Sequence, residues 1–371
     1  MTHLVCTQCG DRYPASEPRW KCECGALLDL EFTPRFDRQR IVSRPPSMWR
    51  YREALPIERD EAILTFGEGF TPLAPFRIGG RDVLVKQDQL FPTGSFKDRG
   101  AAVLISKARE LGVRQVVEDS SGNAGCAIAA WSARAGITCE IYVPASTSPA
   151  KTAQIELYGA RLVRVSGSRE DTARAVLQAA NTTYYASHSW NPFFFHGAKT
   201  WAFEVWEQLG WRAPDAVVLP VGNGTLLLGA SLGFRELLAA GQIERLPRII
   251  AVQSERCAPL AQAFSRHSAT PVSIEKQDTL AEGIAIAEPV RGEQILSAVR
   301  DSAGAFLTVS EAEIETSLIE MAHQGAYIEP TAAAAIAGAA QYGQQAPANE
   351  LVVTVFTGHG LKSTEKILKI L

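Results

Sequence analysis

The sequence predicts an α/β protein with largely parallel sheets, and three observations lead to this fold class. Strand-like and helix-like segments alternate from Leu64 to the end of the chain. The strand-like segments are apolar and β-branched throughout, as in strands that are covered on both faces. The 371 residues suffice for two domains, and no linker separates them. We therefore expect two open parallel-sheet domains that are interleaved in sequence.

The expected elements follow one another in a regular order. The expected strands cover residues 83–86, 114–118, 137–143, 161–165, 216–221, 248–253 and 351–356. The expected helices cover residues 97–111, 124–135, 150–158, 169–180, 197–209 and 225–239. Residues 31–60, rich in Arg and Pro, are expected to form a connecting arm. The expected domains are a cysteine-rich module at 1–30, a large domain at 31–104 and 195–371, and a small domain at 105–194.

Composition excludes several classes of protein. A hydrophobic content of 46% and a charged content of 21% are typical of soluble globular proteins. The net charge of -3 gives no reason to expect a nucleic-acid partner. The longest apolar run, near 331–340, is too short to cross a bilayer, and the N-terminus lacks the pattern of a signal peptide. We expect a cytoplasmic protein with neither a membrane nor a nucleic-acid partner.

The seven cysteines fall into two sets. Three are isolated in apolar surroundings, where a small buried residue is expected: Cys126, Cys139 and Cys257. The other four lie in a C-x2-C-x12-C-x-C pattern, and glycine follows two of them, as in the knuckles of a zinc ribbon: Cys6, Cys9, Cys22 and Cys24. The short C-x-C half strains a tetrahedral site. Structural zinc, a metal-free remnant and reduced thiols therefore all stay open.

The loop Phe91–Gly100 places a lysine where a helix begins. Pro92 and Gly94 interrupt regular structure, so Lys97 falls in the first turn of the following helix. The positive end of the helix dipole, with partial burial, lowers the pKa of an amine and makes it a better nucleophile toward a carbonyl. The alternative is a solvated surface lysine.

Two glycine-containing loops follow expected strands and precede expected helices, where parallel sheets bind ligands. In residues 119–125, backbone N–H groups suit a carboxylate, and Asn123 adds an amide; the alternative is an ordinary capped turn. In residues 220–225, glycines at a helix N-terminus suit a phosphate. The third glycine of the dinucleotide motif is missing there, and the chain has no nucleotide-binding P-loop sequence.

A third loop, residues 357–362, follows the last expected strand. Thr357 brings a hydroxyl to the carboxyl end of that strand. His359 lies between glycines, where a histidine satisfied by backbone is favoured over a titrating group. Together the three loops and Lys97 offer an amine, a phosphate cradle, a carboxylate cradle, an amide and a hydroxyl. Pyridoxal 5'-phosphate needs this combination, so we expect it as cofactor.

Four motifs carry a resemblance to the fold-type II pyridoxal phosphate enzymes: Ser95–Arg99, Ser121–Gly125, Gly222–Thr225 and Thr357–Gly360. Their order and spacing, with the N-terminal cysteine module, are most similar to the threonine synthases. The resemblance implies a tryptophan synthase β-like fold with a small zinc-ribbon-like module, a large cofactor-binding domain and a homodimer. It also implies a small amino acid as substrate.

The resemblance assigns roles residue by residue. Lys97 is the catalytic residue, which bonds the cofactor aldehyde and then moves protons. The other cofactor-binding residues are Asn123 at the ring oxygen, Gly222, Asn223, Gly224 and Thr225 at the phosphate, and Thr357 at the pyridine nitrogen. The substrate carboxylate falls to Ser120, Ser121 and Gly122. Residues 329–331 line the cleft. A hydroxyl at the pyridine nitrogen favours elimination and replacement over transamination, since it does not hold that nitrogen protonated.

One segment departs from the threonine synthase pattern. Where the family supplies an Asn-Ser pair and an arginine to the substrate phosphate, this chain has His188, Ser189 and Phe194. Loss of a bidentate clamp weakens binding of a phosphorylated substrate. The leading function is conversion of O-phosphohomoserine to threonine and phosphate. The rival is β-elimination or β-replacement on serine, threonine or a diaminopropionate-like amino acid. A silent binding paralogue is disfavoured, because it needs no lysine at 97.

Overall fold

The computed structural model describes residues 2–167 and 169–370 and shows an α/β protein with parallel and mixed sheets. The chain forms two compact units. The first unit combines Met1–Gly69 with Lys97–Ala198, and the second combines Phe70–Phe96 with Lys199–Leu371. The chain therefore passes between the units three times, and Lys97 is the first residue after one of these passages.

The units divide the expected domains in a particular way. The expected small domain, 105–194, lies wholly in the first unit. The expected large domain is divided: its residues 31–69, 97–104 and 195–198 group with the first unit, and 70–96 and 199–371 group with the second. The expected arm at 31–60 holds short helices, α1 (Arg38–Ser43) and the 3-10 helix η1 (Met48–Ala54). The buried side chains of Trp49 and Tyr51 make this stretch part of a core.

The first unit contains two sheets. A small antiparallel sheet has the order β2-β1-β3, formed by Arg12–Pro14, His3–Cys6 and Leu28–Glu31. A parallel sheet has the order β8-β7-β6-β9, formed by Arg161–Val165, Thr138–Pro144, Gln115–Glu118 and Tyr184–Tyr185. Val117 pairs with Tyr185, so β6 and β9 end at the same edge. This pairing decides which side chains meet at that edge.

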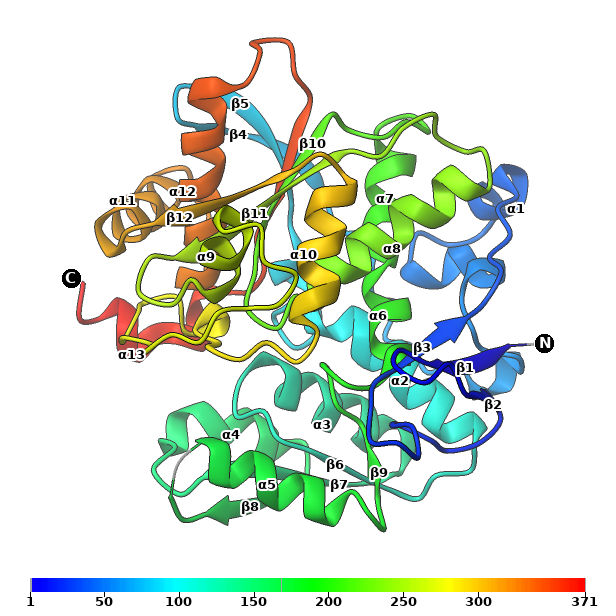
Figure 1. The fold of residues 1–371 in the computed structure, drawn as a ribbon. Coiled ribbons are helices and arrows are strands. Elements are labelled where there is room, and N and C mark those ends of the chain that lie inside the picture. Colours follow the sequence, from blue (N-terminus) through cyan, green and yellow to red (C-terminus); the bar gives the residue numbers. More distant parts are fainter. Residues whose placement is uncertain (1, 168, 371) are drawn as a thin grey trace. The chain divides into compact units, whose positions relative to one another are not determined.

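The longer helices of the first unit are α2 (Lys97–Glu110), α3 (Asn123–Ala135), α4 (Pro149–Leu157), α5 (Arg169–Ala179) and α6 (Pro192–Ala198). Of these, α3, α4 and α5 pack on the parallel sheet, at the bottom of Figure 1, while α2 packs against α3 and α6. The helix α6 lies against α2 so closely that a Cβ atom on Gly197 would meet the carbonyl oxygen of Arg99 at 2.0 Å. Only glycine permits this contact.

The second unit contains a six-stranded sheet with the order β12-β11-β10-β13-β5-β4. Its strands are Ala305–Val309, Arg248–Ser254, Ala216–Pro220, Val352–Val355, Arg81–Lys86 and Leu73–Ile78. Only β4, at one edge, pairs antiparallel among the described strands of this sheet. The sheet is therefore mixed, and the expected parallel core is confirmed for the rest of it.

Helices cover both faces of this sheet, as Figure 1 shows for α12 on one face and α8 and α10 on the other. The helices are α7 (Thr200–Gln208), α8 (Thr225–Ala239), α9 (Pro259–Ser265), α10 (Gly292–Asp301), α11 (Glu311–His323), α12 (Pro330–Gln345) and α13 (Thr364–Ile367). The 3-10 helices are η3 (Asp88–Leu90), η4 (Glu282–Ile284) and η5 (Gly360–Ser363). The alanine-rich α12 brings its backbone close to β11, since a Cβ on Gly338 would meet Val252 at 2.3 Å.

The single helix expected at 197–209 is wrong. Two helices, α6 and α7, stand there, because the chain leaves the first unit after Ala198 and enters the second at Lys199. Cys126, Cys139 and Cys257 are buried, as expected. Over the described ranges, none of the helices combines the length and the apolar character needed to cross a membrane.

Candidate active site

The phosphate cradle expected at residues 222–225 lies at the carboxyl edge of the six-stranded sheet. It follows β10 and opens α8, whose fifteen residues align their N–H groups toward this loop. Gly224 has φ +72° and, in the described structure, no side chain caps the helix. A Cβ on Gly224 would meet Ile295 Cδ1 at 2.3 Å, and one on Gly222 would meet the Cα of Ile284 at 2.9 Å. The loop therefore combines closely packed glycines with the N-terminus of α8, and this arrangement suits a phosphate.

Thr357 reaches the same edge, because it follows β13, which pairs parallel with β10. Its hydroxyl is buried and donates a hydrogen bond of 2.8 Å to Glu329 Oε1. The hydrogen of Thr357 is committed to a carboxylate, so the oxygen offers its lone pairs to any further partner.

The loop that leads to Lys97 is tied to this edge by backbone bonds. Phe96 N donates to Thr357 O at 2.9 Å, and His359 N donates to Gly94 O at 2.9 Å. The hydroxyl of Ser95 is completely buried and has no hydrogen-bond partner in the part of the chain that the structure describes. Ser95 pairs with Gly358, next to Thr357, so this buried donor without a partner fits a polar cofactor near the Thr357 hydroxyl. The donor set of the second unit thus matches pyridoxal phosphate.

His359 is a turn residue. Its Nδ1 accepts a hydrogen bond of 3.2 Å from Leu361 N, at the start of η5. This confirms that backbone satisfies the histidine, the alternative that the sequence favoured.

Lys97 begins α2 in the first unit and is half-buried, so it is not a fully solvated surface lysine. Its Nζ lies 5.6 Å from the centre of the Phe194 ring. That ring in turn covers α2, since a Cβ on Gly100 would meet it at 2.2 Å. Phe194 is completely buried. Phe194, the residue aligned with the family's arginine, therefore presents an apolar ring to Lys97.

The carboxylate cradle expected at 120–122 stands at the carboxyl end of β6 and opens α3 at Asn123. Gly122 N donates to Ser120 Oγ at 3.3 Å. A Cβ on Gly125 would lie 1.8 Å from Ser120 O, so the turn requires glycine there. Ser121 is half-buried and Gly122 is exposed. The loop is therefore an open helix N-terminus that can receive an anion.

A buried histidine and a buried glutamate meet at the edge of the parallel sheet. His188 Nδ1 lies 2.6 Å from Glu118 Oε1. Glu118 ends β6, and His188 stands three residues after the end of its neighbour β9. Burial, then the charge of Asp119, raise the pKa of Glu118 well above its usual range. Burial, then the charges of Lys97 and Arg169, hold the pKa of His188 well below its usual range. Both shifts favour a net-neutral pair.

Asp119 is held by two partners beside this pair. Arg169 Nη2 lies 2.7 Å from Asp119 Oδ2, and the Tyr185 hydroxyl donates to Asp119 Oδ1 at 2.7 Å. Sequence reasoning gave no role to Glu118, Asp119 or Tyr185. An acid at the end of an apolar strand was a visible signal, because buried carboxylates are rare unless they are paired. The partner could not be read from the sequence, since strand order decides it.

Two further polar residues near Phe194 in the sequence, Ser189 and Lys199, have partners within their own units. The amine of Lys199 lies 2.7 Å from Glu236 and is buried in the second unit. Burial lowers the pKa of this amine, although the glutamate opposes the shift. Ser189 Oγ lies 3.3 Å from Ser187 Oγ, and both residues are buried. Lys199 therefore belongs to the core of the second unit.

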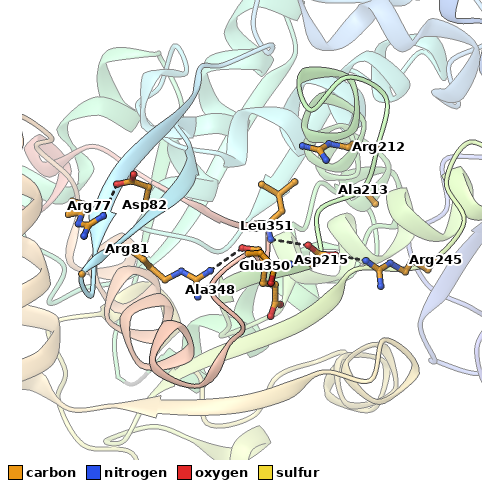
Figure 2. A pocket seen from close by; sticks show the side chains of 12 residues that line it. Arg77, Arg81, Asp82, Arg212, Ala213, Asp215, Arg245, Ala348, Glu350 and Leu351 are labelled. Carbon is orange, nitrogen blue, oxygen red and sulfur yellow. Dashed lines mark hydrogen bonds and ion pairs between the residues drawn. The ribbon is translucent and has the colours of Figure 1, made fainter.

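A cavity of about 690 Å³ lies at the opposite, amino edge of the six-stranded sheet (Figure 2). Several of its lining residues come shortly before β10, β11 and β13 in the sequence. The lining is rich in arginine, yet each of these side chains already has a hydrogen-bond or ion-pair partner. The pairs are Arg77 with Asp82, Arg81 with backbone carbonyls including that of Glu350, Arg212 with the Leu209 carbonyl, and Arg245 with Asp215. None of the expected catalytic groups lines this cavity.

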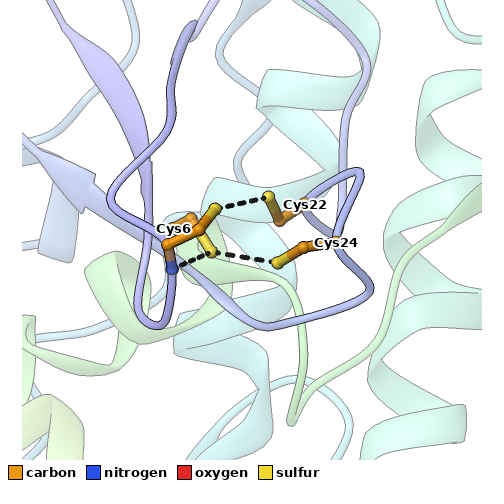
Figure 3. Close-up of side chains that lie close together, drawn as sticks. Cys6, Cys22 and Cys24 are labelled. Carbon is orange, nitrogen blue, oxygen red and sulfur yellow. Dashed lines mark hydrogen bonds between the residues drawn. The ribbon is translucent and has the colours of Figure 1, made fainter.

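The four N-terminal cysteines gather at the small antiparallel sheet (Figure 3). Their sulfur atoms all lie within 4.8 Å of one another. Gly10 and Gly25, which follow two of them, have φ of +78° and +89°. Backbone N–H groups of Gln8 and Cys9 donate to Cys6 Sγ at 3.4 Å each. Burial raises the pKa of Cys6, but these N–H groups outweigh it and lower the pKa to about 6. Four convergent thiols of this kind can hold a metal ion.

The sequence matches a known family of proteins. The profile of the family described as pyridoxal-phosphate dependent enzyme matches residues 64–358. A threonine synthase from Methanocaldococcus jannaschii is 34% identical over 98% of this chain and 94% of the relative. A threonine synthase from Synechocystis sp. is 38% identical over 85% of this chain and 82% of the relative.

Solved structures show the same fold. Threonine deaminase isoform 2 from Solanum lycopersicum has a TM-score of 0.70 at 22% identity, over 96% of this chain and 94% of that one. Maize serine racemase has a TM-score of 0.67 at 20% identity, over 82% of this chain and 94% of that one. At these identities the likeness concerns the fold alone.

Proposed function

The chain belongs to the pyridoxal-phosphate dependent enzymes, and on that premise we propose that it is a threonine synthase-like lyase. Its reaction converts O-phosphohomoserine to threonine and phosphate. The relatives named threonine synthase support this proposal, because they match nearly the whole chain. The family also supplies the finer fold that we propose, a tryptophan synthase β-like pair of interleaved domains.

The cofactor has a residue of the chain for each of its functional groups. Bound pyridoxal phosphate supplies an aldehyde that bonds a primary amine, and a ring that accepts electrons. We assign the aldehyde to Lys97, the ring oxygen to Asn123 and the ring nitrogen to Thr357. The phosphate goes to Gly222, Asn223, Gly224 and Thr225. Phe96, the residue before Lys97, bonds the Thr357 backbone. This bond, within the second unit, is the observation that carries the proposal, because it holds the residue before Lys97 next to the residue assigned to the ring nitrogen.

The substrate roles stay with the first unit. Ser120, Ser121 and Gly122 are assigned to the substrate carboxylate, and the open start of α3 supports this. His188 and Ser189 are assigned to the group that leaves. The test is release of phosphate and threonine when the cofactor-loaded protein meets O-phosphohomoserine. We expect both products in equal amounts. Release of neither would end the proposal.

A second function has one specific observation in its favour. Phe194, aligned with the family's arginine, is completely buried against Gly100 and carries no charge. A pocket without that cation suits β-elimination or β-replacement on serine, threonine or a diaminopropionate-like amino acid. Ammonia and a 2-oxo acid from these substrates, with no product from O-phosphohomoserine, would identify this rival.

We propose that the cysteine module is zinc-ribbon-like and holds structural zinc on Cys6, Cys9, Cys22 and Cys24. Convergent sulfur atoms and two glycine knuckles support this. The purified protein should contain one zinc ion per chain by elemental analysis. Cys24→Ser should lower that content, while Cys257→Ser, which changes a buried thiol outside the module, should not. Equal zinc in both variants would refute the site.

Further proposals rest on the family and the composition. We propose domains at 31–104 with 195–371 and at 105–194, a homodimer, a cytoplasmic location, and no nucleic-acid or membrane partner. The domain proposal draws on the interleaved order of the units. Light scattering of the purified protein tests the dimer, and a monomeric mass would contradict it.

A further inference from the structure

His188 and Glu118 form a buried pair whose place in the first unit the sequence did not reveal. The two atoms that meet, Nδ1 and Oε1, are 2.6 Å apart, a short distance for a hydrogen bond that involves nitrogen. Glu118 is completely buried, and His188 is 7% exposed. The second carboxylate oxygen of Glu118, Oε2, is buried with no hydrogen-bond partner among the described residues. Such a carboxylate is costly to ionise.

The pair stands beside the amine that bonds the cofactor. The Phe194 ring has its centre 6.2 Å from that of His188 and 5.6 Å from Lys97 Nζ. Histidine and lysine therefore contact one aromatic ring. Glu118 also directly precedes the loop Asp119–Gly122, to which we assign the substrate carboxylate. Lys97, the loop at 120–122 and His188 therefore belong to one region of the first unit, where a bound substrate would lie.

We propose that His188 and Glu118 form a proton relay that protonates the leaving group of the substrate, His188 as the donor and Glu118 as its proton store. This inference rests on the proposed function and names a residue pair for its elimination and addition steps. It replaces the positive charge of the family's arginine with a neutral acid.

Protons and electrons balance in each direction. Nε2–H gives its proton to the leaving phosphate oxygen as the carbon–oxygen bond breaks, and the bond's electron pair stays on that oxygen. At the same time Nδ1 takes the proton of Glu118 Oε1. His188 ends neutral, with its hydrogen on Nδ1, and Glu118 ends as a carboxylate. When water later adds to the β-carbon, its proton passes to Nε2, and Nδ1 returns its own to Glu118. The relay is thereby reset.

Burial explains why a pair is needed. A lone histidinium here is disfavoured by burial and by the charges of Lys97 and Arg169. A lone carboxylate is disfavoured by burial and by Asp119. A neutral His188 that is hydrogen-bonded to a protonated Glu118 avoids both charges in the resting state. After the proton has moved, the unpartnered Oε2 gives the carboxylate a strong tendency to recover it, which suits the return step.

The first test measures the proton store directly on the cofactor-loaded protein at pH 7. An infrared difference spectrum between wild type and Glu118→Gln should show the carbonyl band of a buried protonated carboxylic acid in wild type only. Glu140→Gln, on the neighbouring strand β7, is the matched control and should leave the band in place. Absence of the band in wild type would mean that Glu118 is ionised and would overturn the proposal.

The second test separates proton transfer from binding. Glu118→Gln keeps the shape and a hydrogen bond to Nδ1 but has no proton to give. Its kcat for phosphate release should fall by about 10²–10⁴-fold, the usual contribution of a general acid, while KM is unchanged. His188→Asn should lose as much. His267→Asn, at an exposed turn whose φ of +54° asparagine tolerates, is its control. Unchanged kcat in Glu118→Gln would refute the relay.

The two tests also separate this inference from the proposed function. If wild type releases no phosphate, the proposed function fails. The infrared band then still decides the relay, since its presence supports a proton store at Glu118 and its absence overturns one. If wild type releases phosphate and threonine but the band is missing, only the relay fails.

Discussion

The carboxyl edges of the two sheets carry opposite kinds of chemistry. The edge of the six-stranded sheet consists of glycine backbone, a helix N-terminus and the Thr357 hydroxyl, with Glu329 as its buried acid. The edge of the four-stranded sheet carries Glu118, Asp119 and His188, with Arg169 nearby. We propose that the first edge holds the fixed anion of the cofactor and that the second holds and moves protons next to the loop assigned to the substrate carboxylate.

This contrast has a physical basis. A cofactor phosphate keeps its charge throughout the reaction, so fixed N–H dipoles serve it best. A leaving group and an attacking water change their protonation, so they need titratable neighbours whose pKa values burial has moved. Lys97, the proposed nucleophile, opens a segment of the first unit directly after Phe96 of the second.

The largest expected effect is at Lys97, the residue assigned to the cofactor aldehyde. Lys97→Ala should abolish turnover and the fixation of cofactor by borohydride, because no other amine is assigned to the aldehyde. Far-ultraviolet circular dichroism should be unchanged. The matched control is Lys276→Ala, an exposed lysine of the second unit that should keep full activity. Full activity in Lys97→Ala would show that the cofactor is bonded elsewhere.

The next effect tests whether the carboxyl edge of the six-stranded sheet binds the cofactor phosphate. Gly224→Ala forces a left-handed backbone on alanine, at about 1–2 kcal/mol, and drives Cβ into Ile295. Affinity for pyridoxal phosphate should fall about tenfold or more in a spectroscopic titration. Gly241→Ala has φ +65° but nothing within 4 Å of its Cβ, so it adds backbone strain alone. Equal cofactor affinity in the two variants would remove Gly224 from the cradle.

A smaller effect concerns the one buried acid of that edge. Thr357→Val keeps the shape but leaves Glu329 Oε1 without the hydroxyl that donates to it. An unsatisfied buried group costs about 1–3 kcal/mol, so urea unfolding should show a loss of this size. Thr357→Ser restores the hydroxyl and should recover most of it. A stability of Thr357→Val equal to wild type would show that the hydrogen bond contributes nothing.

The smallest effect is the dependence of stability on pH at the four-stranded edge. The raised pKa of Glu118 stabilises the folded state below its ordinary pKa, and this is lost as pH rises toward the folded-state value. The lowered pKa of His188 acts in the opposite sense, since its contribution is lost as pH falls below its ordinary pKa. Glu118→Gln should therefore gain stability relative to wild type between pH 5 and pH 8.

Other charged groups surround this pair and keep their effect in both proteins. They are Lys97 on α2, Arg169 on α5, Asp119 and Tyr185 beside the strand ends, and Cys139 on β7. Urea unfolding of both proteins at the two pH values measures the difference, with Glu140→Gln as control. A difference that stays constant with pH would mean that the pKa of Glu118 is not raised on folding.

Sequence and structure agree on the parts of the site that local chemistry specifies. The glycine loop at 222–225 and the start of α2 at Lys97 stand at the expected junctions, because turn and helix-start signals act over a few neighbouring residues. The helix expected across Lys199 is wrong, since its periodicity continued where the chain changes units. The spacing of apolar residues indicates which side chains are buried, but it does not indicate which unit's core they join.

The sequence by itself determined the fold class and the glycine loops, because alternating segments and glycine turns are local properties of the chain; that Lys97 is the nucleophile stays a prediction. The tertiary structure alone decided that Glu118 meets His188, seventy residues later, and that Thr357 donates to Glu329. Both contacts depend on strand order and on the packing of distant segments, which no local pattern encodes. Strand order placed β9 beside β6, and burial there raises the pKa of Glu118 and lowers that of His188.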